Sequence, residues 1–123
     1  MTKILVIEDN PIVRSTVGRV LQAGGYEVIS ADDGLEGVAM FHKERPDLVV
    51  TDIIMPEQEG IETIRQILAE KPATKIIAIS GGGRIGNTDF LQIARKIGAA
   101  EVLPKPFDPE DLLQLVANCL KAA

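Results

Sequence analysis

Aromatic residues and cysteines are scarce in this chain. Tryptophan is absent, aromatic residues make up 3% of the sequence, and Cys119 is the single cysteine. One cysteine excludes an intrachain disulfide, and so few aromatic rings argue against a stacking surface for single-stranded nucleic acid. No apolar run approaches the length of a transmembrane helix, and the acidic N-terminal segment lacks the pattern of a signal peptide. We therefore expect a cytoplasmic protein that does not enter the membrane.

Positively charged residues are also few. The chain has 13 lysines and arginines against 18 acidic residues, which gives a formal net charge of −5. Nucleic-acid binding normally relies on a basic face, so we do not expect this segment to bind nucleic acid directly. The length of 123 residues and the hydrophobic content of 46% instead fit one domain with its own core. We expect that domain to span residues 1–123.

Short apolar runs alternate with longer amphipathic stretches along the chain. The runs predict strands at residues 4–7, 26–31, 48–51, 75–79 and 101–103. Helical spacing of apolar residues predicts helices over residues 11–23, 33–44, 61–70, 90–97 and 108–120. Asn10 is placed to cap the first of these helices, and a glycine pair ends it. Five strands that alternate with five helices indicate a doubly wound (βα)5 α/β sandwich around a five-stranded parallel sheet.

Polar residues stand where four of the predicted strands end. Glu8 and Asp9 follow the first strand, Asp52 the third and Ser80 the fourth, and Lys105 lies just beyond the fifth. Open α/β sheets bind ligands beyond the carboxyl ends of their strands, so these side chains are expected to converge. Considered one at a time, these residues could simply cap a helix, lie in a turn or, for Lys105, extend into solvent. Together they supply three carboxylates, a hydroxyl and an ammonium at one edge of the sheet.

Three neighbouring carboxylates repel one another, and a hard divalent cation relieves that repulsion. We expect Mg²⁺ or Mn²⁺, with Asp9 and Asp52 as carboxylate ligands. Glu8 is expected to bind the cation directly or through water, and the backbone carbonyl of Ile54 offers a further oxygen.

A carboxylate next to a bound cation can act as a nucleophile toward a phosphoryl group. Asp52 is the expected nucleophile, because it is central and directly follows a buried strand. Lys105 would balance the charge of the incoming group, and Ser80 would donate one hydrogen bond to it.

Several short segments of the chain form one ordered set. They are residues 7–10 with their acidic pair, residues 51–56 with Gly60 behind them, Ser80, residues 98–99 and residues 105–107. In this set the chain resembles the receiver domains of bacterial two-component response regulators, over nearly its whole length. Each match is weak by itself, whereas all of them in this order and spacing are specific.

This resemblance implies a flavodoxin-like fold with strand order 2-1-3-4-5. It implies that Asp52 accepts a phosphoryl group from a histidine kinase or a histidine phosphotransfer protein, and that the domain then changes its surface for a downstream partner or effector domain. Such a domain is not a turnover enzyme, although it assists its own phosphorylation and slow dephosphorylation.

The resemblance also implies the ligand set of the site. Mg²⁺ would lie at Glu8, Asp9, Asp52 and the Ile54 carbonyl. Ser80 and Lys105 would contact the phosphoryl oxygens. In such proteins the bond between Lys105 and the proline that follows it is often cis.

Two departures from the family pattern concern the conformational change that follows phosphorylation. Val102 stands three residues before Lys105, where the family commonly has tyrosine or phenylalanine. The stretch after Ser80 is rich in glycine from Gly81 to Gly86 and slightly longer than usual. Our hypothesis is that this glycine-rich loop carries the response to phosphorylation in place of the aromatic side chain. Amide exchange of residues 81–87 with and without a phosphoryl mimic tests it, and equal protection in both states would refute it.

Two other functions compete with a signalling domain. A metal-dependent aspartyl-phosphate phosphohydrolase often has a second aspartate two positions after the nucleophile, where this chain has Ile54. A nucleotide- or flavin-binding module needs a glycine-rich phosphate cradle after its first strand, where this chain has Glu8, Asp9, Asn10 and Pro11.

Overall fold

Five parallel strands form one sheet with helices on both of its faces. The computed structural model describes residues 1–53, 60–80, 92 and 94–121, and of Ser80 only the backbone. The strands are β1 (Lys3–Ile7), β2 (Glu27–Ala31), β3 (Leu48–Asp52), β4 (Lys75–Ser80) and β5 (Glu101–Pro104). Over the described residues the helices are α1 (Pro11–Ala23), α2 (Gly34–Glu44), α3 (Gly60–Glu70) and α5 (Pro109–Lys121), and residues 94–96 are helical as well. The predicted doubly wound α/β fold is confirmed.

The strand order is β2-β1-β3-β4-β5, as the resemblance implied. The chain leaves β1 toward β2 on one side and later returns to β3 on the other side. This reversal creates a switch point between the carboxyl ends of β1 and β3, where open α/β sheets bind their ligands. The register pairs Ile7 with Thr51 and Asp52 with Ile79, so the ends of β1, β3 and β4 lie next to one another.

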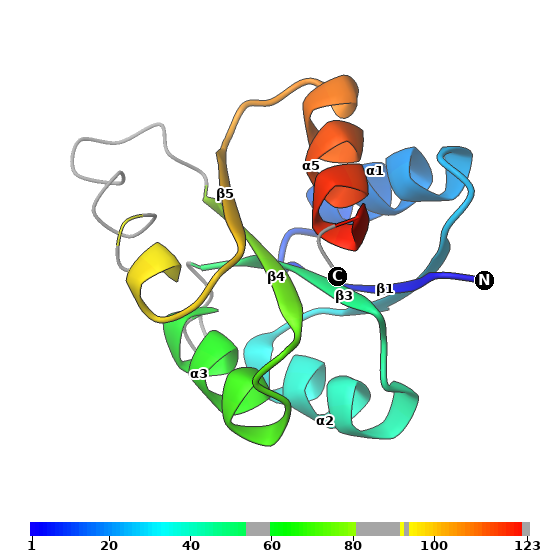
Figure 1. Ribbon diagram of the computed structural model, residues 1–123. Coiled ribbons are helices and arrows are strands. Elements are labelled where there is room, and N and C mark those ends of the chain that lie inside the picture. The colour runs from blue at the N-terminus through cyan, green and yellow to red at the C-terminus, as the bar shows by residue number, and fades with distance from the viewer. Residues whose placement is uncertain (54–59, 81–91, 93, 122–123) are drawn as a thin grey trace.

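Two apolar layers sandwich the sheet. Figure 1 shows α1 and α5 over one face and α2 and α3 over the other. Alternate residues of each strand point into opposite layers, and this is why the central strands are apolar at almost every position. One layer contains the buried residues Ile4, Val6, Val17, Leu21, Leu48, Val50, Ile77, Ile79, Leu103, Leu112, Val116 and Cys119. The other contains Leu5, Ile7, Ala31, Phe41, Val49, Ile53, Ile64, Ile67, Ile76, Ala78, Ala94 and Ala99.

The predicted element boundaries hold to within about one residue at most ends. The Asn10 side chain accepts hydrogen bonds from the backbone N–H groups of Ile12 and Val13, which confirms it as the cap of α1. Asp33 caps α2 in the same way, by accepting from the Glu36 N–H group. Because Asn10 caps α1, the carboxylates of the preceding acidic pair remain available at the sheet edge.

Some expectations fall outside the described residues. They are the Ile54 carbonyl, the loop from Gly81 to Gly86, and residues 90, 91 and 93 of the helix expected over residues 90–97. Residues 92 and 94–96 of that helix are helical, and residue 97 lies in the turn that follows. Val102 lies in β5, is half-buried and packs against the core layer of α2 and α3. No helix in the described part of the chain is both long and apolar enough to cross a bilayer.

Gly60 packs too closely against the end of β3 to carry a side chain. A Cβ atom at this position would collide with the Asp52 carbonyl oxygen and the Ile53 Cα atom. We expect Gly60→Ala to lower the free energy of unfolding by about 1–3 kcal/mol, because a closely packed backbone must move to admit the methyl group. Urea unfolding measures the change.

Gly18 provides the matched control. It lies in the interior of α1, and a Cβ atom there would meet only Val28 Cγ1, at 3.7 Å. Gly18→Ala should therefore raise stability by about 0.5–1 kcal/mol, because alanine favours helix more than glycine does. If both variants shifted stability in the same direction, the close packing at Gly60 would not be the cause.

Candidate functional site

Asp52 ends the central strand β3 and is buried, with 5% of its surface exposed. Two hydrogen bonds fix the backbone of Ile53, the residue that follows Asp52. The Ile53 N–H donates to the Ile79 carbonyl at 3.0 Å, and the Gly60 N–H donates to the Ile53 carbonyl at 3.1 Å. The strand end is therefore held by β4 and by the start of α3, and the Asp52 carboxylate has a defined position at the sheet edge.

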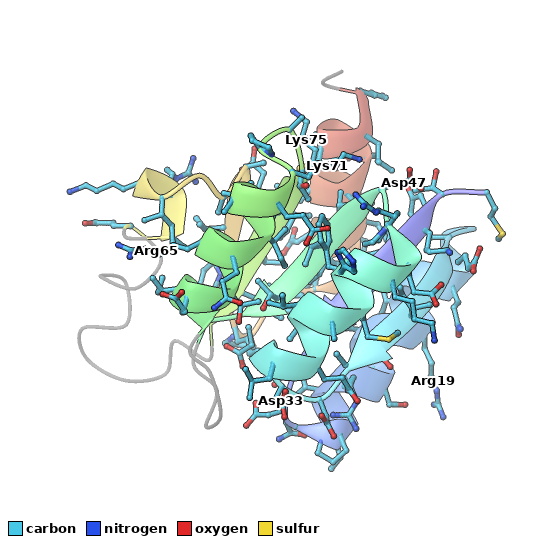
Figure 2. All side chains as sticks on the ribbon, turned by 90° about the horizontal axis from the view of Figure 1, so that it is seen from below. Arg19, Asp33, Asp47, Arg65, Lys71 and Lys75 are labelled. Atoms are coloured by element: carbon cyan, nitrogen blue, oxygen red, sulfur yellow. The ribbon has the colours of Figure 1, made fainter. Side chains whose placement is uncertain are left out.

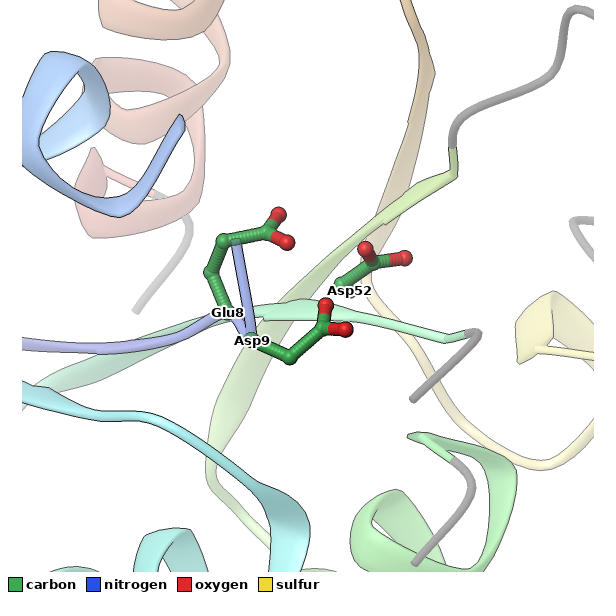
Figure 3. A group of neighbouring side chains, drawn as sticks. All are labelled: Glu8, Asp9 and Asp52. Carbon is green, nitrogen blue, oxygen red and sulfur yellow. The ribbon is translucent and has the colours of Figure 1, made fainter. Parts of the chain in front are cut away.

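Glu8 and Asp9 form the turn between β1 and α1. Glu8 is almost fully buried and Asp9 is partly exposed. One carboxylate oxygen from each of Glu8, Asp9 and Asp52 lies within 4.8 Å of the other two. Figure 3 shows the three side chains coming together beyond the ends of β1 and β3. The predicted convergence of acids from two neighbouring strand ends is confirmed.

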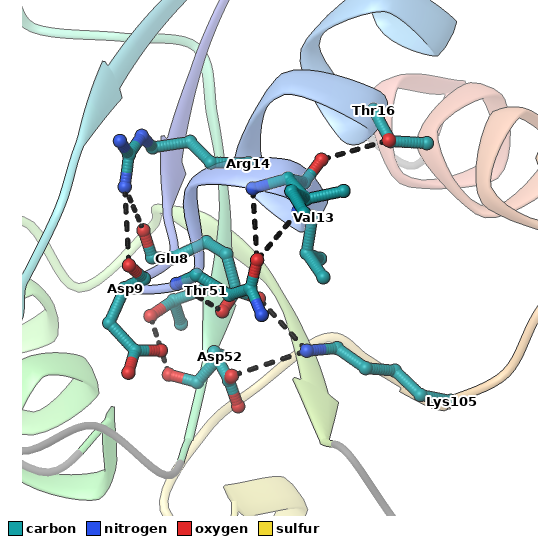
Figure 4. A network of polar contacts seen from close by, with 10 residues as sticks. Glu8, Asp9, Val13, Arg14, Thr16, Thr51, Asp52 and Lys105 are labelled. Atoms are coloured by element: carbon teal, nitrogen blue, oxygen red, sulfur yellow. Dashed lines mark hydrogen bonds and ion pairs between the residues drawn. The ribbon is translucent and has the colours of Figure 1, made fainter.

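Lys105 reaches into this acidic group from the segment after β5. Its Nζ atom lies 2.9 Å from Glu8 Oε1 and 3.3 Å from Asp52 Oδ2 (Figure 4). The peptide bond between Lys105 and Pro106 is cis, as expected. Burial lowers the Lys105 pKa, but the Glu8 hydrogen bond and the charge of Asp52 outweigh burial and raise it overall. The amine is therefore a stable ammonium beside both carboxylates.

The site carries more negative than positive charge. It holds three carboxylates and one ammonium, and Lys105 pairs with the carboxylates of Glu8 and Asp52. Burial, and then the charge of Asp52, raise the pKa of Glu8 to about 7, although Lys105 and the Asn10 N–H oppose this rise. A raised carboxyl pKa means that the site stabilises a further positive charge, whether a proton or a metal ion.

A small divalent cation fits this donor set. Carboxylate oxygens are the ligands that Mg²⁺ and Mn²⁺ prefer, and three of them lie close enough to share one ion. A dication would also balance the two negative charges that Lys105 leaves uncompensated.

Cation binding at this site should depend on pH. With a Glu8 pKa of about 7 in the free protein, protons compete with the cation below that pH, because ligand carboxylates must be ionised. We expect Mg²⁺ affinity near pH 6 to be about tenfold weaker than near pH 8. Isothermal titration calorimetry at several pH values measures this dependence.

Glu8→Gln is the control for that dependence. The amide does not titrate, so the affinity of this variant should be lower at high pH and nearly constant across the range. A wild-type affinity that is equally flat would mean that Glu8 is ionised throughout.

Four of the predicted site residues lie together: Glu8, Asp9, Asp52 and Lys105. Ser80 is the last residue of β4, which places its backbone at the same edge, while its side chain is outside the described part of the structure. The sequence interpretation missed Arg14, whose guanidinium donates to the carbonyl oxygens of Glu8 and Asp9. A contact from a side chain to main-chain oxygens leaves no motif, so helical spacing alone could not have revealed it.

An apolar groove of about 550 Å³ begins at the site. It runs between α1 and the segment after β5, and Lys105 is part of its lining. Its other lining residues are Ile12, Val13, Thr16, Val17, Val20, Pro106, Phe107 and Pro109. Ile12 lies on this groove and is 76% exposed, so the groove presents a large apolar side chain to the solvent.

The sequence has clear relatives. Residues 4–117 match the family described as "Response regulator receiver domain". The chain is 33% identical to chemotaxis protein CheY of Listeria monocytogenes over 122 residues, which are 98% of this chain and 100% of that protein. It is 33% identical to protein PilH of Pseudomonas aeruginosa, over 94% of this chain and 95% of that one.

Solved structures show the same similarity in three dimensions. The crystal structure of a response regulator receiver domain protein from Clostridium thermocellum superposes with a TM-score of 0.92 and 32% sequence identity. That match covers 98% of this chain and 95% of the other. A CheY-like receiver domain protein from Methanospirillum hungatei has a TM-score of 0.88 and 29% identity, over 98% and 94% of the two chains.

Proposed function

The chain belongs to the response regulator receiver domain family, and from that premise we propose that Asp52 is the residue that accepts the phosphoryl group. Members of this family are phosphoacceptor signalling domains, and we propose that residues 1–123 form one such domain. One observation carries the assignment of Asp52: of the three acids at the site, it alone ends a central strand and lies within 3.3 Å of the Lys105 ammonium. Glu8 also touches that ammonium, at 2.9 Å, but it belongs to the turn between β1 and α1 and not to a strand.

The reaction exchanges one bond to phosphorus for another. An Asp52 carboxylate oxygen forms a bond to phosphorus while the bond from phosphorus to the donor's histidine nitrogen breaks, and the imidazole leaves with a proton. Lys105, at hydrogen-bond distance from Asp52, would balance the negative charge of the incoming phosphoryl oxygens. Ser80 would donate to one of these oxygens.

Mg²⁺, or Mn²⁺ in its place, would be held by Asp9, Asp52 and the Ile54 carbonyl, with Glu8 binding directly or through water. The bound ion supplies positive charge that offsets repulsion between the acids and the phosphoryl group. The task of the chain's own residues is to hold the carboxylates in place before the donor arrives.

Phosphorylation by a small donor tests this proposal without any partner protein. The wild-type protein is incubated with acetyl phosphate, with Mg²⁺ or with a chelator, and its intact mass is recorded. We expect a gain of one phosphoryl group that requires Mg²⁺ and disappears slowly once the donor is removed. No gain in either condition would overturn the assignment.

The physiological donor is proposed to be a histidine kinase or a histidine phosphotransfer protein. The apolar groove that starts at Lys105 supports this, because a protein bound there would place its own side chains beside Asp52. Ile12→Glu should slow phosphotransfer from a histidine kinase that phosphorylates the wild type by about tenfold or more, since it puts a charge into an apolar contact. Acetyl phosphate should phosphorylate this variant at the wild-type rate, and equal loss with both donors would contradict docking at the groove.

We also propose an effect of phosphorylation on a downstream partner. Phosphorylation would change the surface presented to a partner protein or effector domain, in the cytoplasm and without direct binding of nucleic acid. The phosphohydrolase alternative is not favoured by the family membership. It would release many phosphates per protein molecule, whereas a receiver domain retains one.

A further inference from the structure

The turn that carries Glu8 and Asp9 presents two different faces. Its carboxylates point toward Asp52 and Lys105, as Figures 3 and 4 show. The backbone carbonyl oxygens of the same two residues instead accept hydrogen bonds from the guanidinium of Arg14, a residue of α1 (Figure 4). The backbone of this turn sets where the side chains of Glu8 and Asp9 begin, so a restraint on its carbonyls limits the positions that the two carboxylates can reach.

Arg14 contacts both carbonyls. Its Nη1 atom lies 2.8 Å from the Glu8 carbonyl oxygen and 3.5 Å from that of Asp9. The side chain is partly buried. The bond to the Glu8 carbonyl has the length of a strong hydrogen bond from a charged donor, whereas the longer contact with the Asp9 carbonyl is weak. Together they restrain the backbone of the turn.

Arg14 lies near the N-terminus of its helix, where a positive charge is unfavourable. It is the fourth residue of α1, and the first turn of that helix has no acidic residue. A cation near a helix N-terminus is unfavourable, because the helix dipole is positive there. The guanidinium reaches the carbonyl oxygens of the turn before the helix, whose partial negative charge opposes this cost.

We propose that Arg14 is a positioning residue for the cation site. It fixes the turn at Glu8 and Asp9 so that the carboxylates of these two residues stay close to Asp52 before any ion binds. This inference rests on the proposed function of Asp9 and Asp52 as cation ligands, and adds a residue that itself touches neither the ion nor the phosphoryl group. Groups that orient metal ligands typically change metal affinity by about 10- to 100-fold when they are removed.

Two explanations of Arg14 predict opposite results. If only its charge matters, replacing it removes a cation that repels Mg²⁺, and Mg²⁺ binding becomes tighter. If Arg14 positions the turn, replacing it leaves the carbonyls unrestrained, and binding becomes weaker. The direction of the change therefore separates charge from geometry.

The experiment measures Mg²⁺ binding by isothermal titration calorimetry, without a phosphodonor, for Arg14→Ala, Arg14→Lys and Arg19→Ala. Arg19 is the matched control, because it is exposed on the same helix and projects outward from the molecule (Figure 2). We expect Arg14→Ala to weaken binding about tenfold and Arg19→Ala to leave it within about twofold of the wild type. Arg14→Lys keeps the charge but loses the planar guanidinium, so it should also weaken binding.

Thermal unfolding of the same variants shows whether Arg14 has only a structural role. Such a role would lower the Tm while the Mg²⁺ Kd of the folded protein remained at the wild-type value, and that result would overturn the proposal. Tighter binding by Arg14→Ala would overturn it as well. A wild type that fails to bind Mg²⁺ would instead refute the proposed function, so the two failures are distinguishable.

Discussion

Asp52→Asn should gain no phosphoryl group from acetyl phosphate under conditions that phosphorylate the wild type. Asparagine has nearly the same shape as aspartate, but its amide lacks the ionised oxygen that attacks phosphorus. The loss should be complete within the sensitivity of intact-mass measurement, because the other two acids at the site are engaged differently. Glu8 pairs with Lys105 and the Asn10 N–H, and Asp9 is a proposed cation ligand.

The pKa of Glu8 shows whether Asp52→Asn keeps the rest of the site intact. The charge of Asp52 is one of the causes that raise the Glu8 pKa to about 7. Asp52→Asn removes that charge, so the Glu8 pKa should fall while burial keeps it above its ordinary value. Carboxyl NMR of Glu8 across the pH range measures this shift. A phosphoryl gain equal to that of the wild type, in a variant with the lowered Glu8 pKa, would show that another residue is the acceptor.

Asp9→Asn should weaken Mg²⁺ binding by about 100-fold, and phosphorylation should slow correspondingly at low Mg²⁺. The variant keeps Asp52 and its contact with Lys105, so the nucleophile itself is intact. It loses one of the three carboxylates that lie together at the sheet edge, the one proposed as a cation ligand. Calorimetry measures the affinity, and the intact mass at several Mg²⁺ concentrations measures the reaction.

Asp32→Asn is the matched control for that change. Asp32 is exposed and follows β2 at the same edge of the sheet, so the substitution removes the same charge without removing a ligand. Its Mg²⁺ affinity should stay within about twofold of the wild type, since exposed charges outside the site are largely screened. Equal effects of the two substitutions would mean that the site attracts Mg²⁺ only through its overall charge.

The fold could be predicted because the strands are simple to recognise. Parallel strands covered on both faces are apolar along their whole length, and β1, β3 and β4 follow this pattern closely. The start of α1 was marked by Asn10, a residue type that caps helices, whereas Asp33 was expected as the first residue of α2 and proves to be its cap. The strand order came from the resemblance, because alternation of strands and helices does not by itself determine which strands are neighbours.

The site could be predicted in outline, since parallel strands bring their carboxyl ends to one edge. That rule places Glu8, Asp9 and Asp52 together whatever their side chains do. The same rule brings Lys105 to this edge, because it lies just beyond β5. The rule does not predict that Lys105 bridges Glu8 and Asp52, because that contact depends on side-chain conformations in the folded protein.

Arg14 and Gly60 show what sequence patterns miss for a different reason. Arg14 binds main-chain oxygens, and Gly60 leaves room for main-chain atoms of β3. Main-chain atoms are the same at every position, so neither contact has a partner that the sequence can identify. Contacts of this kind become visible only when the backbone has been traced through the site.

Chemical mapping of the phosphorylated residue tests the central claim most directly. Borohydride reduces an aspartyl phosphate to homoserine, and peptide sequencing by mass spectrometry then locates the homoserine in the wild-type chain after reaction with acetyl phosphate and Mg²⁺. We expect homoserine at position 52, and unmodified acids at positions 8 and 9. Modification at Glu8 or Asp9 with position 52 unchanged would contradict the assignment of Asp52 as the phosphoryl acceptor and of the other two acids as cation ligands.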